Sequence, residues 1–329
     1  MNSICESLCS IGEEVIDKDN LLRLLDNKKD IIAYDGFEPS GKMHIAQGLL
    51  RAHNVNKFTQ AGIKFKFWVA DWFALMNLKF GGDLKRIQNA GHDMIRVWKA
   101  CGMDMTNVEF IWSSEEINKR SDEYWKLVLD IATKFNLTRI KKCTQIMGRE
   151  ESDDLMASQI FYPAMQCADI FFLKADICSL GIDQRKVNML ALEYCDKIKR
   201  KNKPIIISHH MIMGLDGTKM SKSNPDNAIF MDDNMSEIKR KINKAYCEEG
   251  NIEKNPLLDW NKHIIIPISC KFILQGNQKY NEETIEYTNF SILEEDFANK
   301  KIFPSRLKQS VTSHLIGLLI PVQEKLKTL

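Results

Sequence analysis

The 329-residue chain has no long apolar segment, no paired-cysteine motif and little net charge, and each of these absences excludes a class of protein. No apolar run approaches the roughly 18 residues that a membrane-spanning helix needs. Nine cysteines are scattered without a C-x-x-C spacing, which argues against a metal or redox motif and favours a reducing compartment. The formal net charge of +2 neither requires nor excludes nucleic acid, so only local clusters can argue for it.

The amino terminus also lacks a basic region followed by an apolar stretch. Glu6, Glu13 and Glu14 lie where a transit peptide would be free of acidic residues. Together with the reducing compartment that the cysteines favour, these features predict a cytosolic protein that does not use a membrane.

Two common nucleotide-binding motifs are missing as well. No G-x-G-x-x-G sequence follows an expected strand, so the dinucleotide fingerprint is absent. Residues 36–42 fit G-x-x-x-x-G-K, but Met43 stands where a phosphate loop needs Ser or Thr for magnesium. Pro39 also removes one of the amides that would line the loop. The sequence therefore disfavours a P-loop.

Hydrophobic patterning predicts strands that alternate with helices over the first two thirds of the chain. The expected strands are 31–37, 63–69, 108–112, 175–179 and 204–209, and the expected helical regions are 5–27, 83–101, 119–172 and 185–199. This alternation is typical of an α/β fold with a parallel, Rossmann-like sheet.

After Asp232 the strand signal fades, and residues 235–262 and 291–327 look mostly helical. We therefore expect a Rossmann-like catalytic domain over 1–232 and a smaller α-helical domain over 233–329.

The most informative motif is Lys219-Met220-Ser221-Lys222-Ser223, which follows the Gly-rich turn 214–218. Two ammonium groups three positions apart on such a loop can close over a polyphosphate and release it. A solvated basic turn is the simpler interpretation, but the five-residue pattern is specific enough to favour the phosphate site.

His44 lies after the first expected strand, in what should be the first turn of a helix. Free N–H groups and the helix dipole favour an anion there, so the histidine could bind phosphate. A lone histidine is more often a satisfied core residue, but the Lys-Ser motif shifts the balance. The two motifs together resemble the signature motifs of class I aminoacyl-tRNA synthetases.

Tyr162, Gln166 and Asp169 form a second group, because spacings of four and three place them on one face of a helix. The flanking residues are so apolar that this helix should be largely buried, and its polar face then needs polar partners. The face either completes an internal network or lines a pocket for a polar ligand. We favour the pocket, because a buried carboxylate is rare unless it has a functional role.

Asp183 and Gln184 follow the fourth expected strand, at an edge where open α/β sheets bind ligands. Asp183 could accept ribose hydroxyls, and Gln184 could hold a small polar ligand. The alternative for Asp183 is a helix N-cap. Tyr34 lies near the end of the first strand and faces either the core or the pocket.

Taken together, these residues resemble the tyrosyl-tRNA synthetases of the archaeal and eukaryotic cytosolic type. The resemblance runs from about residue 20 to the end of the chain and is densest in 34–41, 160–169, 181–186 and 214–223. It implies an enzyme that activates L-tyrosine with ATP and transfers it to tRNA(Tyr).

The resemblance also implies a role for each candidate residue. Tyr34 and Asp169 would bind the phenol of tyrosine, and the ammonium and carboxylate would be surrounded by Tyr162, Gln166 and Gln184. His44, Lys219 and Lys222 would be catalytic, with Mg²⁺, and the ATP-binding set would be Gly41, His44, Gln47, Asp183, Lys219 and Lys222. Gln47 stands where relatives often have a second histidine, and its amide can donate to phosphate but carries no charge.

For tRNA, the resemblance implies contacts by Arg185, Lys186, Tyr280 and Arg306. Relatives usually show His-Pro-x-Asp-Leu-Lys near the carboxyl terminus, whereas residues 303–308 read Phe-Pro-Ser-Arg-Leu-Lys. Arginine cannot accept a hydrogen bond from a guanine edge, so we expect the first anticodon base to be read differently. The family also implies a homodimer, with residues 119–140 as a candidate interface, and no DNA partner.

Three alternatives remain at this point. A tryptophanyl enzyme would share the nucleotide motifs, but Tyr34 with Asp169 favours tyrosine. A non-catalytic, synthetase-like RNA-binding protein would be expected to lose His44 or the two loop lysines, and all three are present. Another nucleotidyltransferase is disfavoured by the helical carboxyl-terminal region and by the extent of the resemblance.

Overall fold

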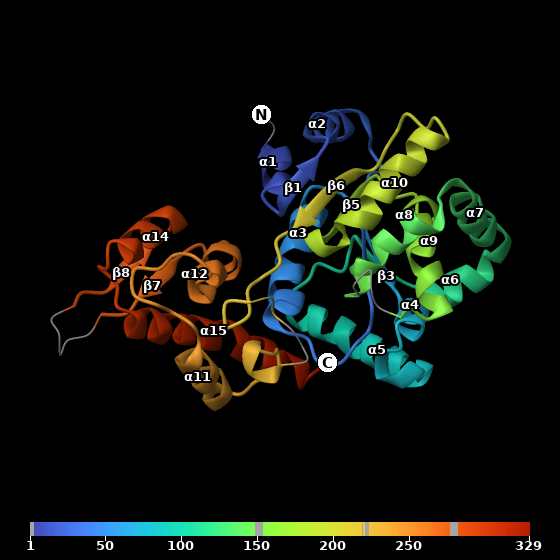
Figure 1. Ribbon diagram of the computed structural model, residues 1–329. Helices are drawn as coiled ribbons and strands as arrows, with labels where there is room; N and C mark the ends of the chain where they lie inside the picture. The colour runs from blue at the N-terminus through green and yellow to red at the C-terminus, as the bar shows by residue number, and fades with distance from the viewer. Residues whose placement is uncertain (1–2, 149–153, 219, 221–223, 277–281) are drawn as a thin grey trace. The chain divides into compact units, whose positions relative to one another are not determined.

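A computed structural model describes residues 3–148, 154–218, 220, 224–276 and 282–329 (Figure 1). The chain forms two compact units. The first contains Met1–Ser40, Asn54–Asp93 and Asp104–His210, and the second contains Gly41–His53, Met94–Met103 and Met211–Leu329. None of the helices in the described ranges is long and apolar enough to cross a membrane.

A six-stranded sheet in the order β1-β6-β5-β2-β3-β4 organises the first unit. Its strands are β1 Gly12–Ile16, β2 Ile32–Phe37, β3 Lys64–Val69, β4 Val108–Trp112, β5 Ile177–Gly181 and β6 Ile205–His209. All neighbours pair in parallel except β1, which runs antiparallel to β6 at one edge. The five strands expected from the sequence are confirmed. β1 was not expected, because its segment looked helical.

Ten α-helices of the described residues lie wholly or partly in the first unit; α3 begins in the second unit, and α5 ends there. They are α1 Ser3–Cys9, α2 Lys18–Asn27, α3 Arg51–Gln60, α4 Asp71–Met76, α5 Leu84–Ala100, α6 Ser113–Lys119, α7 Ser121–Lys134, α8 Leu137–Cys143, α9 Ala157–Phe172 and α10 Arg185–Lys197. Helix α9 packs against α7, α8 and α10, and Figure 1 shows these helices grouped together. This arrangement buries α9, as its apolar sequence predicts.

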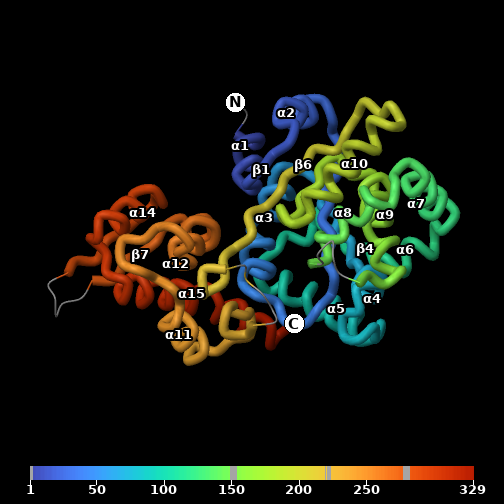
Figure 2. The backbone as a smooth tube through the Cα atoms, viewed as in Figure 1, coloured from blue at the N-terminus to red at the C-terminus, as the bar shows by residue number. Residues whose placement is uncertain are grey.

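The second unit is mainly helical. Its described elements are the π-helical turn η1 Ala46–Leu50, α11 Met235–Lys244, α12 Pro256–Trp260, η6 Asn261–Ile265, α13 Ile266–Ser269, α14 Phe290–Ala298, α15 Pro304–Leu326, and the short antiparallel strands β7 Phe272–Leu274 and β8 Ile285–Tyr287. Helix α15 runs alongside α11 (Figure 2). The sequence predicted the helical character of residues 235–262 and 291–327, but it did not predict the β7–β8 pair.

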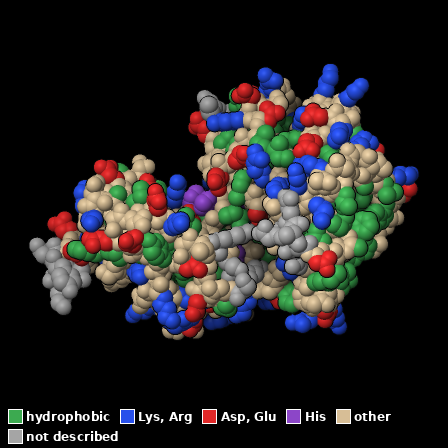
Figure 3. All heavy atoms as spheres, viewed as in Figure 1, with side chains coloured by type: hydrophobic (Ala, Val, Ile, Leu, Met, Phe, Trp, Pro, Cys, Tyr) green, Lys and Arg blue, Asp and Glu red, His purple; other side chains and the backbone are tan. Residues whose placement is uncertain are grey.

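Lys and Arg side chains gather on the face drawn in Figure 3 near the end of α10 and the turn after it. Lys199, Arg200 and Lys201 are exposed there. This turn is a local basic cluster in a chain whose net charge is close to zero.

Candidate active site

The polar face of α9 is buried against β2 in the first unit. Tyr34 on β2 is 1% exposed, Asp169 is 0% exposed, and Tyr162 and Gln166 are each 7% exposed. The residues around Asp169 on α9 are almost all apolar and buried, so the helix carries its carboxylate into the hydrophobic core. The sequence prediction that this polar face is buried is therefore confirmed.

Among the described residues, only one of the two Asp169 oxygens accepts a hydrogen bond, and the buried indole N–H of Trp68 lies near the carboxylate. Its Oδ1 accepts a hydrogen bond of 2.8 Å from the Tyr124 hydroxyl. Its Oδ2 is buried and accepts no hydrogen bond from the part of the chain that the structure describes. Burial raises the pKa of Asp169 well above its usual value, and the Tyr124 hydroxyl and the nearby Trp68 indole N–H oppose that shift. A donor that reaches Oδ2 would satisfy this oxygen and stabilise the ionised form.

Tyr34 lies close enough to Asp169 for the carboxylate to influence its hydroxyl. Burial raises the pKa of Tyr34 well above its usual value, and the nearby Asp169 raises it further. Tyr34 is therefore a neutral hydroxyl that can donate. A Cβ on Gly36 would come within 3.1 Å of the Tyr34 hydroxyl oxygen, so glycine at this position leaves room for it.

Other polar side chains of this region form hydrogen bonds with one another. The Tyr162 hydroxyl donates to Glu38 Oε1 at 2.7 Å, and Glu38 also accepts from Asn77 Nδ2 at 3.0 Å. Gln166 Nε2 donates to Gln184 Oε1 at 3.0 Å. Burial and the neighbouring Glu38 raise the pKa of Tyr162 well above its usual value. The site thus offers a carboxylate and neutral amides, a set suited to a ligand with an ammonium and a carboxylate.

Gln184 is fixed by a second contact, because its Nε2 donates to the Ile146 carbonyl at 3.0 Å. Asp183 lies beside it on a 3₁₀ turn, Ile182–Gln184, directly after β5. This turn is at the carboxyl end of a parallel strand, where the sequence placed it. Arg185 begins α10 and donates its Nε to Glu14 Oε2 at 2.8 Å, while Lys186 follows it on the helix.

In the second unit, His44 immediately precedes a helical turn and does not lie within it. Its carbonyl accepts the first helical hydrogen bond, from the Gly48 amide at 3.0 Å. A Cβ on Gly48 would collide with the Met231 side chain, so glycine allows this close approach. Gly41 adopts a left-handed φ of +65°, which favours glycine. Gln47 lies in η1, and its carbonyl accepts from Trp98 Nε1 at 2.7 Å.

The turn before the Lys-Ser motif is held closely. Asn227 is buried, its Oδ1 accepts from the Asp216 amide at 3.1 Å, and a Cβ on Gly214 would collide with its amide. Thr218 accepts from the Gly214 amide at 2.6 Å. Lys219 and Lys222 themselves lie outside the described residues.

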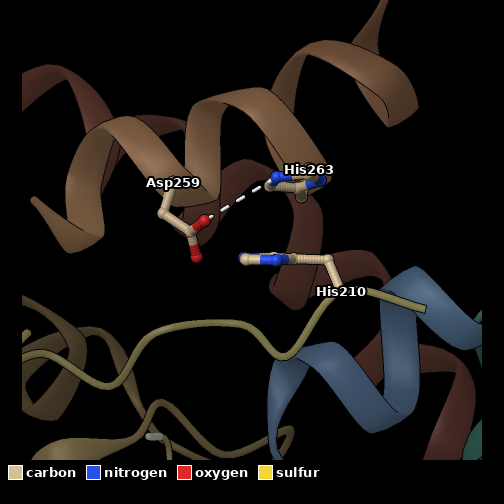
Figure 4. Close-up of side chains that lie close together, drawn as sticks. All are labelled: His210, Asp259 and His263. Carbon is tan, nitrogen blue, oxygen red and sulfur yellow. Dashed lines mark ion pairs between the residues drawn. The ribbon is translucent and has the colours of Figure 1, made fainter. Parts of the chain in front are cut away.

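Asp259 anchors the chain just before this turn. Its Oδ2 accepts from the Met213 amide at 2.9 Å. Figure 4 shows Asp259 and His263 one helical turn apart, and their ion-pair atoms, Oδ1 and Nε2, are 3.7 Å apart. Asp259 thereby fixes the start of the segment that leads to the Lys-Ser motif.

Arg306 is buried at the start of α15, where it is 9% exposed. Its Nε donates to the Gln275 carbonyl at 2.8 Å, and its Nη2 donates to the Glu283 carbonyl. The Glu282 carboxylate lies 3.7 Å from its Nε. The guanidinium therefore holds backbone on both sides of 277–281. Tyr280 falls in that range, outside the described residues.

The sequence and the fold were then compared with known proteins. A family model described as tRNA synthetases class I (W and Y) matches residues 26–319. Tyrosine–tRNA ligase 1, cytoplasmic, of Arabidopsis thaliana is 54% identical over 321 residues, which are 97% of this chain and 83% of that protein.

The chain belongs to the tyrosyl-tRNA synthetases. Its fold agrees with theirs. A Leishmania major tyrosyl-tRNA synthetase in complex with tyrosinol has a TM-score of 0.91 and 47% identity, covering 98% of this chain and 50% of that one. The Archaeoglobus fulgidus tyrosyl-tRNA synthetase complexed with L-tyrosine has a TM-score of 0.89 and 33% identity, covering 98% and 99%. The chain therefore spans about half of the Leishmania protein and nearly all of the archaeal one.

The tryptophanyl alternative receives support for the fold alone. The Plasmodium falciparum tryptophanyl-tRNA synthetase has a TM-score of 0.74 and 17% identity to this chain. The Rossmann-like fold class predicted from the sequence is confirmed by the tyrosyl-tRNA synthetase structures.

Two polar side chains of this buried cluster are missing from the sequence-based prediction. Tyr124 lies 45 residues before Asp169 and Glu38 lies 124 residues before Tyr162. Tyr124 is flanked by acidic residues and Trp125 on an amphipathic helix, where it looks like any core tyrosine. Glu38 could have been found, because it follows Tyr34 by four residues within the densest block of the family resemblance.

Proposed function

We propose that this chain activates L-tyrosine with ATP and transfers the tyrosyl group to the 3′ end of tRNA(Tyr). The observation that carries the proposal is the buried Tyr34–Asp169 pair, in which Asp169 Oδ2 accepts no hydrogen bond from the described residues, in a chain 54% identical to a tyrosine–tRNA ligase. The phenol of tyrosine would donate to Asp169 Oδ2 and accept from the Tyr34 hydroxyl.

This arrangement accounts for selectivity against phenylalanine. Phenylalanine would leave both buried polar groups unpaired, and in this same enzyme family phenol recognition of this kind discriminates by roughly 10⁴–10⁵. The Tyr162 hydroxyl and the Gln166 and Gln184 amides would hold the ammonium and carboxylate of the amino acid. Glu38, which accepts from Tyr162, would strengthen the site for the ammonium.

Adenylate formation would then need positioning and charge stabilisation more than proton transfer. The tyrosine carboxylate is already ionised, so it attacks the α-phosphorus of ATP in line, and pyrophosphate leaves. We assign the phosphates to His44, Lys219 and Lys222, with Gly41 and Gln47 at the same motif and Asp183 at the ribose. In the second step, a hydroxyl of the terminal tRNA ribose takes the tyrosyl group.

Mg²⁺ would neutralise charge on the ATP phosphates when it accompanies the nucleotide. The residues that we assign to the phosphates are an imidazole and two ammonium groups. Lysine ammonium groups cannot ligate a cation. We therefore assign no side chain of this chain to the metal, and the ion would be held by ATP itself.

Binding of tRNA would divide between the two sequence domains that we propose, 1–232 for catalysis and the acceptor stem and 233–329 for the anticodon. Arg185 and Lys186 would contact the acceptor end, for which Arg185 must leave Glu14. Tyr280 would stack on an anticodon base. Arg306 would act on the anticodon site by holding the backbone on both sides of that tyrosine, since its guanidinium donates to two carbonyls.

We further propose that the chain works as a homodimer in the cytoplasm. Large apolar side chains are exposed on α7, α8 and α9: Trp125 at 40%, Leu129 at 62%, Leu137 at 60% and Phe161 at 58%. Apolar surface of this kind commonly marks an interface. Substituting Leu129 and Leu137 together with Glu should give a monomer in sedimentation equilibrium.

The decisive experiment is amino-acid-dependent exchange of pyrophosphate into ATP, with tyrosine, tryptophan and phenylalanine compared. Exchange with tyrosine alone is the expected result. Exchange with tryptophan would overturn the specificity. Absence of exchange in a folded protein that binds RNA would favour the non-catalytic alternative.

A further inference from the structure

Residues 228–233 form a segment that pairs with the backbone around His44 and ends in a turn, which the Asp233 amide closes by donating to the Phe230 carbonyl at 3.1 Å. The Met231 amide donates to the Met43 carbonyl at 2.9 Å, and the Ile45 amide donates to the Ile229 carbonyl at 3.0 Å. His44 itself forms an antiparallel bridge with Phe230. The backbone of this segment therefore determines where the backbone of His44 lies.

Lys241 on α11 holds this segment from behind. Its Nζ is 2.6 Å from Asp233 Oδ2 and donates to the Ala228 carbonyl at 3.0 Å. The same ammonium lies 4.9 Å from the centre of the Phe230 ring. One cation thus contacts both ends and the middle of the segment, and Asp233 Oδ2 closes the arrangement by accepting from the Phe230 amide at 2.9 Å.

Gln323 on α15 holds the same segment a second time. Its Nε2 donates to the Met231 carbonyl at 3.0 Å and to the Asp233 carbonyl at 2.9 Å. Because α11 and α15 pack against each other, the two anchoring side chains come from one helical layer. Both helices lie in the 233–329 region, which we propose contacts tRNA.

The burial of Lys241 is informative because it is costly. Its side chain is only 4% exposed, and removing an ammonium group from water is expensive even when it is paired. A well-packed apolar side chain would often stabilise a fold as well or better. Stability alone therefore gives a weak reason for a lysine here, whereas an ammonium group has several donors and can bind the Ala228 carbonyl and the Asp233 carboxylate at opposite ends of one segment.

We infer that Lys241 and Gln323 are positioning residues for His44. They tie the helices of the carboxyl-terminal region to the backbone that sets the histidine's place at the ATP phosphates. This inference rests on the function proposed above, in which His44 binds ATP. Because both anchors belong to the tRNA-facing helices, a shift of α11 or α15 would move the 228–233 segment and, with it, the histidine.

The test compares two anchor variants with matched controls on the same helices. Gln323→Leu removes two hydrogen bonds, and Lys241→Met removes the ammonium. Gln309→Leu on α15 and Lys239→Met on α11 make the same chemical changes at exposed positions. For each purified full chain, the rate of tyrosyl-adenylate formation is measured in single turnovers against ATP concentration and divided by the fraction of tyrosine-binding sites.

We expect both anchor variants to lose about tenfold or more in the ATP-saturated rate per site, since misplaced catalytic groups commonly cost that much. Tyrosine affinity should stay within twofold of wild type, and both controls should match wild type. Gln323→Glu, which keeps the shape but presents only acceptors to two carbonyls, should be at least as slow as Gln323→Leu.

A merely structural role gives a different pattern. The fraction of active sites would fall while the rate per site and its ATP dependence stayed at the wild-type values, and that result would overturn the inference. If Lys241→Met does not fold, the double variant Lys241→Met/Asp233→Asn removes both charges of the ion pair, and the Gln323 variants still test the inference. A wild-type protein that forms no adenylate would instead refute the proposed function.

Discussion

Replacing Asp169 with Asn tests the tyrosine pocket most directly, because the shape of the side chain is kept and only its charge and one acceptor are lost. The Tyr124 hydroxyl can still donate to Oδ1, as it does at 2.8 Å. The second position becomes an N–H₂ group, which cannot accept from a phenol. A hydrogen bond to a charged group is worth about 1.5–3 kcal/mol, so kcat/KM for tyrosine should fall roughly 10–150-fold.

The same substitution should stabilise the free protein at neutral and alkaline pH. Burial raises the pKa of Asp169 in the folded state, so the protonated carboxyl is favoured there. The stability that this group contributes is present below its ordinary pKa of 3.8 and is lost as pH rises through the raised value. Asn does not ionise and escapes this loss. A gain of about 1 kcal/mol, or roughly 1–2 °C in Tm, is expected at pH 8 and should shrink towards pH 4.

The assay combines tyrosine-dependent pyrophosphate exchange with calorimetry at the two pH values. Asp296→Asn is the matched control, because Asp296 also accepts from a tyrosine hydroxyl, Tyr287 at 2.9 Å. Its pKa is lowered, chiefly by the hydrogen bond from Lys301, so this control should lose stability at pH 8 and keep its tyrosine kinetics. An Asp169→Asn protein with normal tyrosine kinetics and reduced stability at pH 8 would refute both the pocket and the electrostatic reasoning.

Three further substitutions test other parts of the chain. Lys222→Ala should slow single-turnover adenylate formation about 10–100-fold with little change in tyrosine affinity, and an unchanged rate would remove the Lys-Ser motif from the mechanism. Gly214→Ala should lower thermal stability by roughly 1–3 kcal/mol, because its Cβ would strike the buried Asn227 amide, whereas Gly317→Ala, with nothing within 4 Å, should not. His314 accepts from the Ile273 amide at 2.8 Å, and burial lowers its pKa from 6.5. Stability in urea should therefore decline as pH falls below about 6.5, and His314→Gln should flatten that slope.

The sheet could be predicted from the sequence because its central strands are buried on both faces. β6 begins with three consecutive isoleucines, β2 is mostly apolar, and β3 alternates before it ends in Phe67-Trp68-Val69, and the predicted ends of these strands lie close to those observed. Strand β1 was not predicted from the sequence, because Gly-Glu-Glu-Val-Ile lies at an edge of the sheet. It becomes a strand only by pairing with β6, almost 200 residues later. The three-residue strands β7 and β8 are too short for a pattern.

Half of the pocket could be predicted for a related reason. Polar residues on α9 stand out because everything around them is apolar, so burial followed from local sequence alone. Tyr124 sits on the amphipathic α7 and gives no such signal, and its partner Asp169 becomes visible only when α7 packs on α9. The role of Arg306 could not be predicted from its replacement of the Asp that relatives usually have. In the structure, its guanidinium donates to two backbone carbonyls, at Gln275 and Glu283.

The burial of Lys241 is another feature that the sequence does not predict. The segment Lys239-Arg240-Lys241 looks like the solvated face of a basic helix, and Lys239 is indeed exposed. Lys241 is nevertheless buried, because residues 228–233 bring a carboxylate and a carbonyl to it. No local pattern encodes that compensation, since it depends on how the segment is laid against α11. A buried charge whose partners (a carbonyl, a carboxylate and an aromatic ring) all belong to one segment is thus a signal that only the folded structure contains, and it leads from the helices of the carboxyl-terminal region to His44.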